Sequence, residues 1–504
     1  MSVLLPLLAI QIALGAFDNL WHHEIKERLP ARRSARAELA THSLRELCYA
    51  LLFFGLAWWD WHGAWAFVVA GIVVAEVAAT LTDFLIEDAT RRLPPLERAL
   101  HTALAINFGA LLATLAPTLT EWSRLPTAVV AAQRGPWSWF LSACGAFVLA
   151  WAARNALAAL RHFRRPSWER RGLKATPRAG GKHVLVTGAT GFIGRELVYR
   201  LVAHGDEITV FARDRDKAAD LFGPHAAIVT SLDEIPDSAR IDAIVNLAGA
   251  PIASRPWTKR RKLTLLTSRL VVTEGLVKLV ARLTTRPVTW VNASAIGYYG
   301  VRDDDVPLHE KSPSQAIFQS ELCVAWEKCA ARAAEHGVKV ALLRFGLVLG
   351  RDGGALPALA RPVRLGVATI FGSGKQWVSW IHLHDLMELI LFVLEQATLA
   401  GPLNATAPTP LRQAELADAI AAAARARPLR VRIPARLLRA LLGELAEVFV
   451  DGQRVLPERA TALGFKFRYA TAGPALESLT ASAARPFRPE SAARPCSPDP
   501  RGTP

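Results

Sequence analysis

The chain has 504 residues, of which 51% are hydrophobic, with a formal net charge of +16 and a mean hydropathy of +0.21. This length is enough for two to four domains, and the composition excludes a disordered chain and is unlike that of an ordinary soluble enzyme. Five scattered cysteines without a CxxC pair exclude a disulfide-stapled secreted protein, and an arginine excess without a basic–aromatic motif predicts no nucleic-acid partner.

Apolar runs dominate the first third of the chain, at about 3–20, 44–61, 63–82, 100–119 and 137–158. Each approaches the roughly 20 residues that a helix needs to cross a bilayer. The first run lacks a basic n-region and a cleavage site, so we interpret it as a retained helix and not as a signal peptide. Ten of the fifteen tryptophans lie before residue 170, as expected at a membrane interface. We predict an all-α membrane domain over 1–165 with about five transmembrane helices; the alternative is a soluble helical bundle.

The segments between these runs alternate in charge. Arginines are dense in 21–45, in 84–99 and after residue 160, whereas 60–63 has no Lys or Arg and 120–136 has two arginines. The positive-inside rule then places the N-terminus outside and everything after residue 160 in the cytoplasm. The sequence therefore predicts a multi-pass protein whose partner is the lipid bilayer of a bacterial inner (cell) membrane.

Acid–histidine pairs recur in this domain at a spacing of four residues, which places both side chains on one helix face. The pairs are Asp18 with His22, Glu38 with His42, and Glu97 with His101. Nearby lie His23, Glu24, Glu46, Glu76, Asp83, Glu87 and Asp88. Two interpretations stay open: ion pairs with the arginines of the same segments, which we favour, or a carboxylate–imidazole metal or haem site between helices. We assign no metal ligand from the sequence.

A dinucleotide-binding pattern follows the basic, Gly- and Pro-rich linker at 166–181. A strand pattern at 183–187 leads into a glycine-rich turn and a helical pattern, and a second strand follows at 207–212. This order is typical of a Rossmann fold, in which the turn and the helix N-terminus hold a pyrophosphate. The predicted cofactor-binding residues are Gly188, Thr190, Gly191, Phe192, Ile193 and Gly194, together with Leu247, Ala248 and Gly249 after the strand at 243. The alternative is a glycine-rich turn without a ligand.

Strands at 289–294 and 340–345 continue the alternation of strands and helices, which predicts an α/β doubly wound parallel sheet over 182–408. Further motifs are NLAG at 246–249, SAIGYYG at 294–300, GSGKQW at 372–377, WIH at 380–382, LNATAP at 403–408 and LGFKF at 463–467. Over 183–478 the chain resembles the epimerase-family proteins of the extended (atypical) short-chain dehydrogenase/reductase superfamily. The resemblance implies a small C-terminal α/β domain of unknown function on the substrate side, at 409–478. The Pro- and Arg-rich tail at 479–504 is predicted to be disordered.

The same resemblance implies a catalytic Ser, a Tyr and a Lys four residues after that Tyr. Ser294 matches the Ser, but Cys323 stands in the Tyr place and Glu327 in the Lys place. A thiol beside a carboxylate is pushed toward its neutral form. We therefore predict Ser294 with Tyr298 or Tyr299 as the catalytic residues, the alternative being that both phenols only pack beside the pocket. His382 and Asp385 are expected to be structural.

Arg213 follows the second strand, where NAD-specific relatives would carry an acid that binds the ribose hydroxyls. A guanidinium can pair with a 2′-phosphate, so we predict NADP over NAD, although Arg213 can also be an ordinary solvated charge. The predicted function is a membrane-anchored NADP-dependent oxidoreductase or nucleotide-sugar-epimerase-like enzyme acting on a small-molecule substrate. Two alternatives stay open: a non-catalytic dinucleotide sensor or regulatory protein, and electron transfer to a metal or haem in the membrane domain. The oligomeric state is left open.

Overall fold

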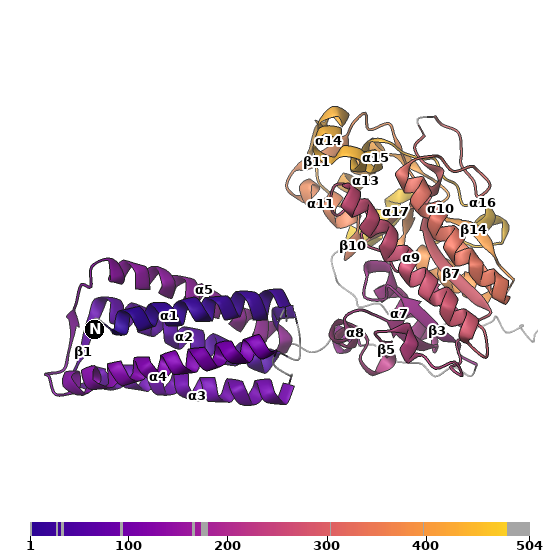
Figure 1. Cartoon of the computed structure of the whole chain (residues 1–504). Coiled ribbons are helices and arrows are strands. Elements are labelled where there is room, and N and C mark those ends of the chain that lie inside the picture. The colour runs from indigo at the N-terminus through magenta and orange to yellow at the C-terminus, as the bar shows by residue number, and fades with distance from the viewer. Residues whose placement is uncertain are drawn as a thin grey trace, which may run out of the picture. The chain divides into compact units, whose positions relative to one another are not determined.

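The computed structural model describes residues 3–26, 29–31, 35–90, 94–163, 167–172, 180–302, 304–396 and 398–480 (Figure 1). The chain divides into two compact units, Met1–Pro166 and Ser167–Pro504. Residues 173–179 of the predicted linker, and all but the first two residues of the predicted tail, lie outside the described residues.

The first unit is a helical bundle. Its long helices are α1 (Leu4–Asp18), α2 (Arg36–Trp58), α3 (Ala64–Thr90), α4 (Pro95–Ser123) and α5 (Pro136–Phe163). A π-helix, η1 (Asn19–Lys26), continues α1, and the short 3-10 helix η2 (Leu29–Ala31) follows. The helices contact one another in a closed ring, with α1 against α4 and α5, and with α2 against α3 and α5. Leu8, Phe53, Leu56, Leu111 and Leu141 are fully buried in its apolar core.

Within the described residues, four helical segments are long and apolar enough to cross a membrane: Leu4–Glu24, Ala64–Asp88, Pro95–Ser123 and Pro136–Leu160. The remaining predicted run, 44–61, is the second in chain order and falls mostly on α2, which is not one of these four. Its polar residues Glu38, His42 and Glu46 are buried inside the bundle, so its composition is that of a helix with an enclosed polar face. Length and composition thus narrow the prediction of five spans to four candidates.

Two short strands join the connections of this bundle. β1 (Trp59–His62) pairs antiparallel with β2 (Ala128–Ala131), so the α2–α3 and α4–α5 connections lie at the same end of the bundle. The guanidinium of Arg134 donates a 2.7 Å hydrogen bond to the carboxylate of Asp60 across this junction. These are the two connections with few basic residues, and their pairing agrees with the predicted alternation.

The second unit is built on a seven-stranded sheet in the order β14-β8-β7-β6-β3-β4-β5. The strands are β3 (His183–Thr187), β4 (Glu207–Phe211), β5 (Ala227–Val229), β6 (Ala243–Asn246), β7 (Thr289–Ala295), β8 (Lys339–Phe345) and β14 (Gly401–Ala405). Every neighbouring pair in this sheet is parallel. The strand order reverses between β3 and β6, which makes that point the topological switch of the sheet. The predicted doubly wound parallel fold is confirmed.

Helices cover both faces of the sheet because alternate strand residues point to opposite sides. Val184 and Val186 of β3 face α7 (Phe192–His204), α8 (Arg215–Phe222) and α12 (Leu383–Glu395). Leu185 faces the opposite layer, which contains α9 (Lys259–Arg282) and α10 (Phe318–Ala331). Two buried faces explain why the strands are continuous apolar runs in the sequence.

A small α/β lobe follows the carboxyl edge of the sheet. In it β11 (Val367–Phe371) pairs in parallel with β16 (Leu429–Ile433). α11 (Leu356–Arg364), α13 (Gln413–Ala423) and α17 (Ala472–Thr480) share one apolar cluster beside these strands. The lobe therefore includes β11 and α11, which precede residue 409.

Candidate functional site

The crevice at the switch point is formed where the backbone passes close to itself at two glycines, Gly188 and Gly194. Thr187 at the end of β3 pairs with Asn246 at the end of β6, so the turns after both strands lie side by side. Gly188 has φ +66°, and a Cβ there would lie 2.5 Å from the carbonyl oxygen of Leu247. A Cβ at Gly194 would lie 2.4 Å from the carbonyl oxygen of Gly188. Only glycine at these two positions lets the turn, α7 and the exit from β6 pack together.

The N-terminus of α7 opens into this crevice without a side-chain cap. Gly191 occupies the N-cap position in an extended conformation, and the first turn of the helix carries no acidic residue. The first N–H groups of a helix have no intrahelical acceptor, and an anion such as a pyrophosphate satisfies them. The backbone of this turn therefore fits a dinucleotide.

The predicted cofactor residues fall into two kinds. Phe192 packs its ring against the antiparallel pair β9 (Leu347–Gly350) and β10 (Gly353–Gly354), where a Cβ at Gly353 would lie 2.3 Å from that ring. Ile193 packs against the core of the sheet. Both side chains are apolar, so the hydrogen-bonding groups that these two residues can offer the cofactor are those of their backbone. Thr190 and Leu247 are half-buried and Gly249 is exposed, whereas the N–H of buried Ala248 donates to the Asn246 side chain at 3.3 Å.

Asn246 is a positioning residue that the sequence did not single out as part of the site. Its Oδ1 accepts from the Thr187 hydroxyl at 2.6 Å, and its Nδ2 donates to Thr273 at 2.9 Å and to Asn292 at 2.7 Å. The fully buried amide thereby holds the ends of β3 and β6 and the middle of β7 in register where the cofactor turn begins.

Arg213 lies just beyond β4 with its side chain exposed. It makes no hydrogen bond or ion pair with any residue that the structure describes. The neighbouring charges are engaged: Asp214 caps α8 by accepting from the N–H of Lys217 at 2.9 Å, and Arg215 lies 3.0 Å from Glu234. The Arg213 guanidinium is thus a cation available to a ligand at the end of β4.

Ser294, at the end of β7, belongs to a buried ionic network. Its hydroxyl donates to Glu327 Oε1 at 2.6 Å. Arg344 at the end of β8 donates to both oxygens of the same carboxylate, at 2.9 and 2.8 Å, and the two charged side chains are only 3% and 8% exposed. Because the Ser294 proton is directed to a carboxylate, this hydroxyl can accept a hydrogen bond from a ligand but has no proton to donate.

The two predicted phenols differ in availability. Tyr299 is fully buried, donates to Asn404 Oδ1 at 2.6 Å and accepts from Arg344 Nη1 at 3.0 Å, and burial raises its pKa to about 12. Tyr298 is half-buried, with its ring centroid 3.3 Å from the Arg344 guanidinium carbon. The Tyr298 hydroxyl makes no hydrogen bond to any described residue. Of the two phenols, Tyr298 is the one available to a ligand.

Cys323 and Glu327, which stand in the Tyr and Lys places, lie on α10 and have structural roles. Burial, and secondarily the Glu327 carboxylate, raises the pKa of the Cys323 thiol to about 11, so the thiol is neutral. Glu327 is paired with Arg344, a residue that no motif pointed to. The position of Arg344 in the sequence could have indicated such a pair, because an arginine inside the apolar strand 339–345 must have a buried partner.

His382 and Asp385 have structural partners, as expected. His382 Nδ1 accepts from the N–H of His384 at 3.0 Å and thereby caps α12, and burial lowers the pKa of His382 to about 4. Asp385 accepts from the backbone N–H groups of Arg468 and Tyr469, at 3.1 and 2.9 Å. These bonds fasten the end of the small lobe to α12.

Residues 184–404 match the model of the NAD dependent epimerase/dehydratase family, and residues 433–479 match a domain of unknown function, DUF1731. The chain is 40% identical over 302 residues to an epimerase family protein, the chloroplastic SDR39U1 homolog of Arabidopsis thaliana, covering 59% of this chain and 86% of that protein. It is 37% identical to the epimerase family protein SH2119 of Staphylococcus haemolyticus, covering 59% of this chain and 99% of that protein.

A solved structure is similar as well. The crystal structure of human epimerase family protein SDR39U1 (isoform2) with NADPH has 33% sequence identity and a TM-score of 0.54, and the match covers 59% of this chain and 99% of the human chain. The match therefore uses nearly the whole of the human chain in that structure and leaves about two fifths of this chain unmatched.

Proposed function

This chain belongs to the NAD dependent epimerase/dehydratase family, and from that premise we propose that it is a membrane-anchored, NADP(H)-dependent oxidoreductase acting on a small molecule. The observation that carries the proposal is the combination, at the carboxyl edge of one sheet, of a glycine cradle at the switch point with a phenol, Tyr298, whose hydroxyl has no partner among the described residues. Ligands of open α/β sheets bind at that edge.

The proposed cofactor is NADP(H) in preference to NAD(H). The exposed Arg213 guanidinium suits a 2′-phosphate, and the similar human protein was solved with NADPH. The test is a titration of the full-length protein in detergent with NADPH and NADH. Arg213→Ala should weaken NADPH binding by about tenfold, the size of a charge-assisted hydrogen bond, and leave NADH unchanged. The control is Arg215→Ala, which removes the neighbouring arginine already paired with Glu234. Equal or tighter NADH binding to the unmodified protein would contradict the role of Arg213.

In the proposed reaction the bound cofactor supplies or accepts a hydride. The Tyr298 hydroxyl donates a proton to the substrate oxygen during reduction, and Arg344 stacked on its ring fixes the ring orientation. Ser294 accepts a hydrogen bond and positions the substrate. Untargeted metabolite comparison of a deletion strain would identify the substrate. Tyr298→Phe should then abolish turnover with NADPH binding unchanged, whereas Cys323→Ser should remain active. The reverse pattern would replace Tyr298 with thiol chemistry.

A non-catalytic dinucleotide sensor is the second candidate. It is favoured by the engagement of Ser294, Glu327 and Arg344 with one another, which leaves the usual catalytic positions occupied by a structural network. The same metabolite comparison distinguishes the two: a sensor would bind NADPH tightly while no accumulated metabolite is turned over by the purified protein.

The proposed anchor is the first unit, inserted in the bacterial inner membrane with the second unit in the cytoplasm. Large apolar side chains face outward, with Phe67, Leu85 and Ile106 68%, 73% and 69% exposed, while a set of acids and histidines is buried inside, among them Glu76, Asp83 and Glu97. This distribution is the reverse of a soluble protein and suits a lipid surround.

We include α2 among five membrane-crossing helices because α3 and α5 flank it and its polar residues face inward. Reporter fusions after Gly63, Leu119 and Gly181 test the topology. Gly63 and Leu119 should report outside and Gly181 inside. A periplasmic signal at Gly181 would overturn this arrangement.

A further inference from the structure

A cluster of buried imidazoles and carboxylates lies inside the helical bundle, and we propose that it binds divalent transition-metal ions through two adjoining sets of ligands. The first set is Asp18, His23, Glu97 and His101, and the second is His23, Glu38, His42 and Glu87. Within each set, one ligand atom from every residue lies within 4.8 Å of the others. Donors on opposite sides of one ion, each bonded at about 2.0–2.3 Å, are about 4.0–4.6 Å apart. One ion per set fits these separations, with His23 as a ligand of the first ion only, because a neutral imidazole has one free ring nitrogen; Glu38, His42 and Glu87 then hold the second ion.

The π-helix η1 creates the first set. α1 ends at Asp18 and His23 follows five residues later, which in an α-helix would place the two side chains about 140° apart. A π-helix hydrogen-bonds residues five apart, and such segments recur at functional sites. His23 Nε2 consequently lies 3.8 Å from Asp18 Oδ2 and 3.7 Å from Glu97 Oε1. These distances are too long for hydrogen bonds and are those of ligands around a shared ion.

The hydrogen bonds behind His23 determine which nitrogen faces the set. Asn19 Nδ2 donates to Glu46 Oε1 at 3.2 Å, so the amide oxygen of Asn19 faces His23 Nδ1 at 3.1 Å and accepts a hydrogen bond from its N–H. Nε2 is then the nitrogen with a free lone pair, and it is buried without a hydrogen bond to any described residue. A lone pair facing two carboxylate oxygens suits a metal cation bound between them.

Asp18 is likewise oriented by a hydrogen bond from a residue that is not itself a ligand, His22. His22 Nδ1 donates to Asp18 Oδ1 at 2.8 Å, while Asp18 Oδ2 lies 3.0 Å from His101 Nε2. Neighbouring donors bonded to one ion at about 2.1 Å are about 3.0 Å apart, so Asp18 Oδ2 and His101 Nε2 can bind the same ion after their shared proton leaves. An imidazole behind a ligating carboxylate is a common means of fixing its orientation.

The charged groups around the two sets are paired separately from the ligands. Arg45 pairs with Asp83 at 2.6 Å and lies 3.8 Å from Glu76, and neither acid belongs to a set. The four carboxylates that do belong carry four negative charges, which two divalent ions balance. Imidazole nitrogen and carboxylate oxygen without thiolate select manganese, iron, cobalt or zinc over copper(I).

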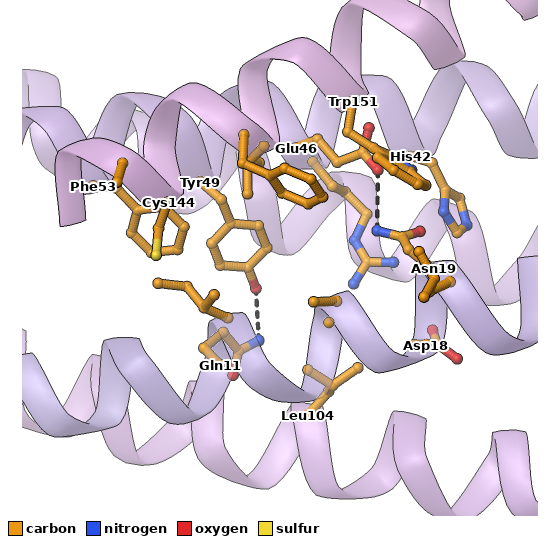
Figure 2. Close-up of a pocket in the computed structure, with 18 of the residues that line it drawn as sticks. Gln11, Asp18, Asn19, His42, Glu46, Tyr49, Phe53, Leu104, Cys144 and Trp151 are labelled. Atoms are coloured by element: carbon orange, nitrogen blue, oxygen red, sulfur yellow. Dashed lines mark hydrogen bonds between the residues drawn. The ribbon is translucent and has the colours of Figure 1, made fainter. Parts of the chain in front are cut away.

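A cavity of about 540 Å³ gives access to the cluster (Figure 2). Asp18 and His42, one from each set, lie in its wall, and Phe53, Leu104 and Trp151 form part of its apolar lining. A structural zinc site is normally closed, whereas this one adjoins a space suited to an apolar molecule with one polar end.

The test uses the full-length protein, purified in detergent, stripped with a chelator and titrated with Co²⁺, whose d–d absorption reports nitrogen and oxygen ligands. After desalting, we expect close to two Co²⁺ per chain by elemental analysis, and a rise in melting temperature with Co²⁺. His23→Gln and His101→Gln should each lose at least one ion and most of that rise. The matched control is His62→Gln on β1, a histidine in neither set, which should retain both.

Two results would overturn the proposal. In the first, the unmodified protein retains no Co²⁺ and its melting temperature does not respond, as expected if the cluster is only a network of ion pairs. In the second, His23→Gln and His101→Gln retain as much Co²⁺ as His62→Gln. Far-UV circular dichroism of each variant keeps loss of metal distinct from loss of fold.

Discussion

Breaking the Glu327–Arg344 pair should cause the largest stability loss of any single contact at the nucleotide site. Among the described residues, Glu327→Leu leaves the Arg344 guanidinium, 3% exposed, with the Tyr299 hydroxyl and the Glu310 carbonyl as hydrogen-bond acceptors and the Tyr298 ring beside it, but with no counter-charge. Removing one member of a buried ion pair costs about 3–5 kcal/mol because the other charge stays in a medium of low dielectric. Ser294 also loses its acceptor, which adds about 1 kcal/mol. Arg344→Met should cost a similar amount, since it strands the carboxylate.

The double variant Glu327→Leu with Arg344→Met separates the energy of the ion pair from the energy of side-chain packing. Two apolar side chains of similar volume leave no buried charge, so Glu327→Leu with Arg344→Met should recover most of the loss, and the coupling energy should be about 3 kcal/mol or more. Urea unfolding of the full-length protein in detergent, followed by pulse proteolysis of the 167–480 unit, provides the four free energies. The exposed pair Arg215–Glu234 is the control, with an expected coupling below about 1 kcal/mol. Additive effects within about 0.5 kcal/mol would refute the argument that the two charges stabilise each other.

Three further outcomes are expected. Gly188→Ala should abolish NADPH binding and destabilise by about 3 kcal/mol, because its Cβ would lie 2.5 Å from the Leu247 carbonyl at φ +66°, whereas Gly337→Ala, at φ +83° in open space, should lose only about 1 kcal/mol and bind NADPH normally. His382 is held neutral in the folded protein with a pKa of about 4, so stability should fall as the pH drops from about 6.5 toward 4; His382→Gln should flatten this slope, and an unchanged slope would count against it. Cys323, with a pKa of about 11, should resist iodoacetamide at pH 8 while half-buried Cys329 reacts, as mass spectrometry of the labelled peptides will report.

The parts of the site that follow strands could be predicted from the sequence. In a parallel sheet the carboxyl ends of strands meet at one edge, so the turn after 187 and the turn after 246 had to come together. Arg344 could not be placed in the same way, because its partner Glu327 comes from a helix and the pairing depends on tertiary packing. Likewise, the spacing of four residues correctly paired Asp18 with His22, but that rule assumes 3.6 residues per helical turn throughout. His23 was named only as a neighbour and was not joined to Asp18, because the helical period changes locally in η1 and the residue pattern alone does not reveal that change.

η1 also makes the bundle sensitive to chain length. A π-helical segment differs from an α-helix by what amounts to one inserted residue, and removing one residue between Asp18 and His23 would restore the α-helical period. His23 would then take the place four residues after Asp18 that His22 now occupies, and the rest of α1 would be undisturbed. Among related membrane domains, a single-residue gap in this segment would therefore mark a different arrangement around Asp18, even where every histidine and acid is present.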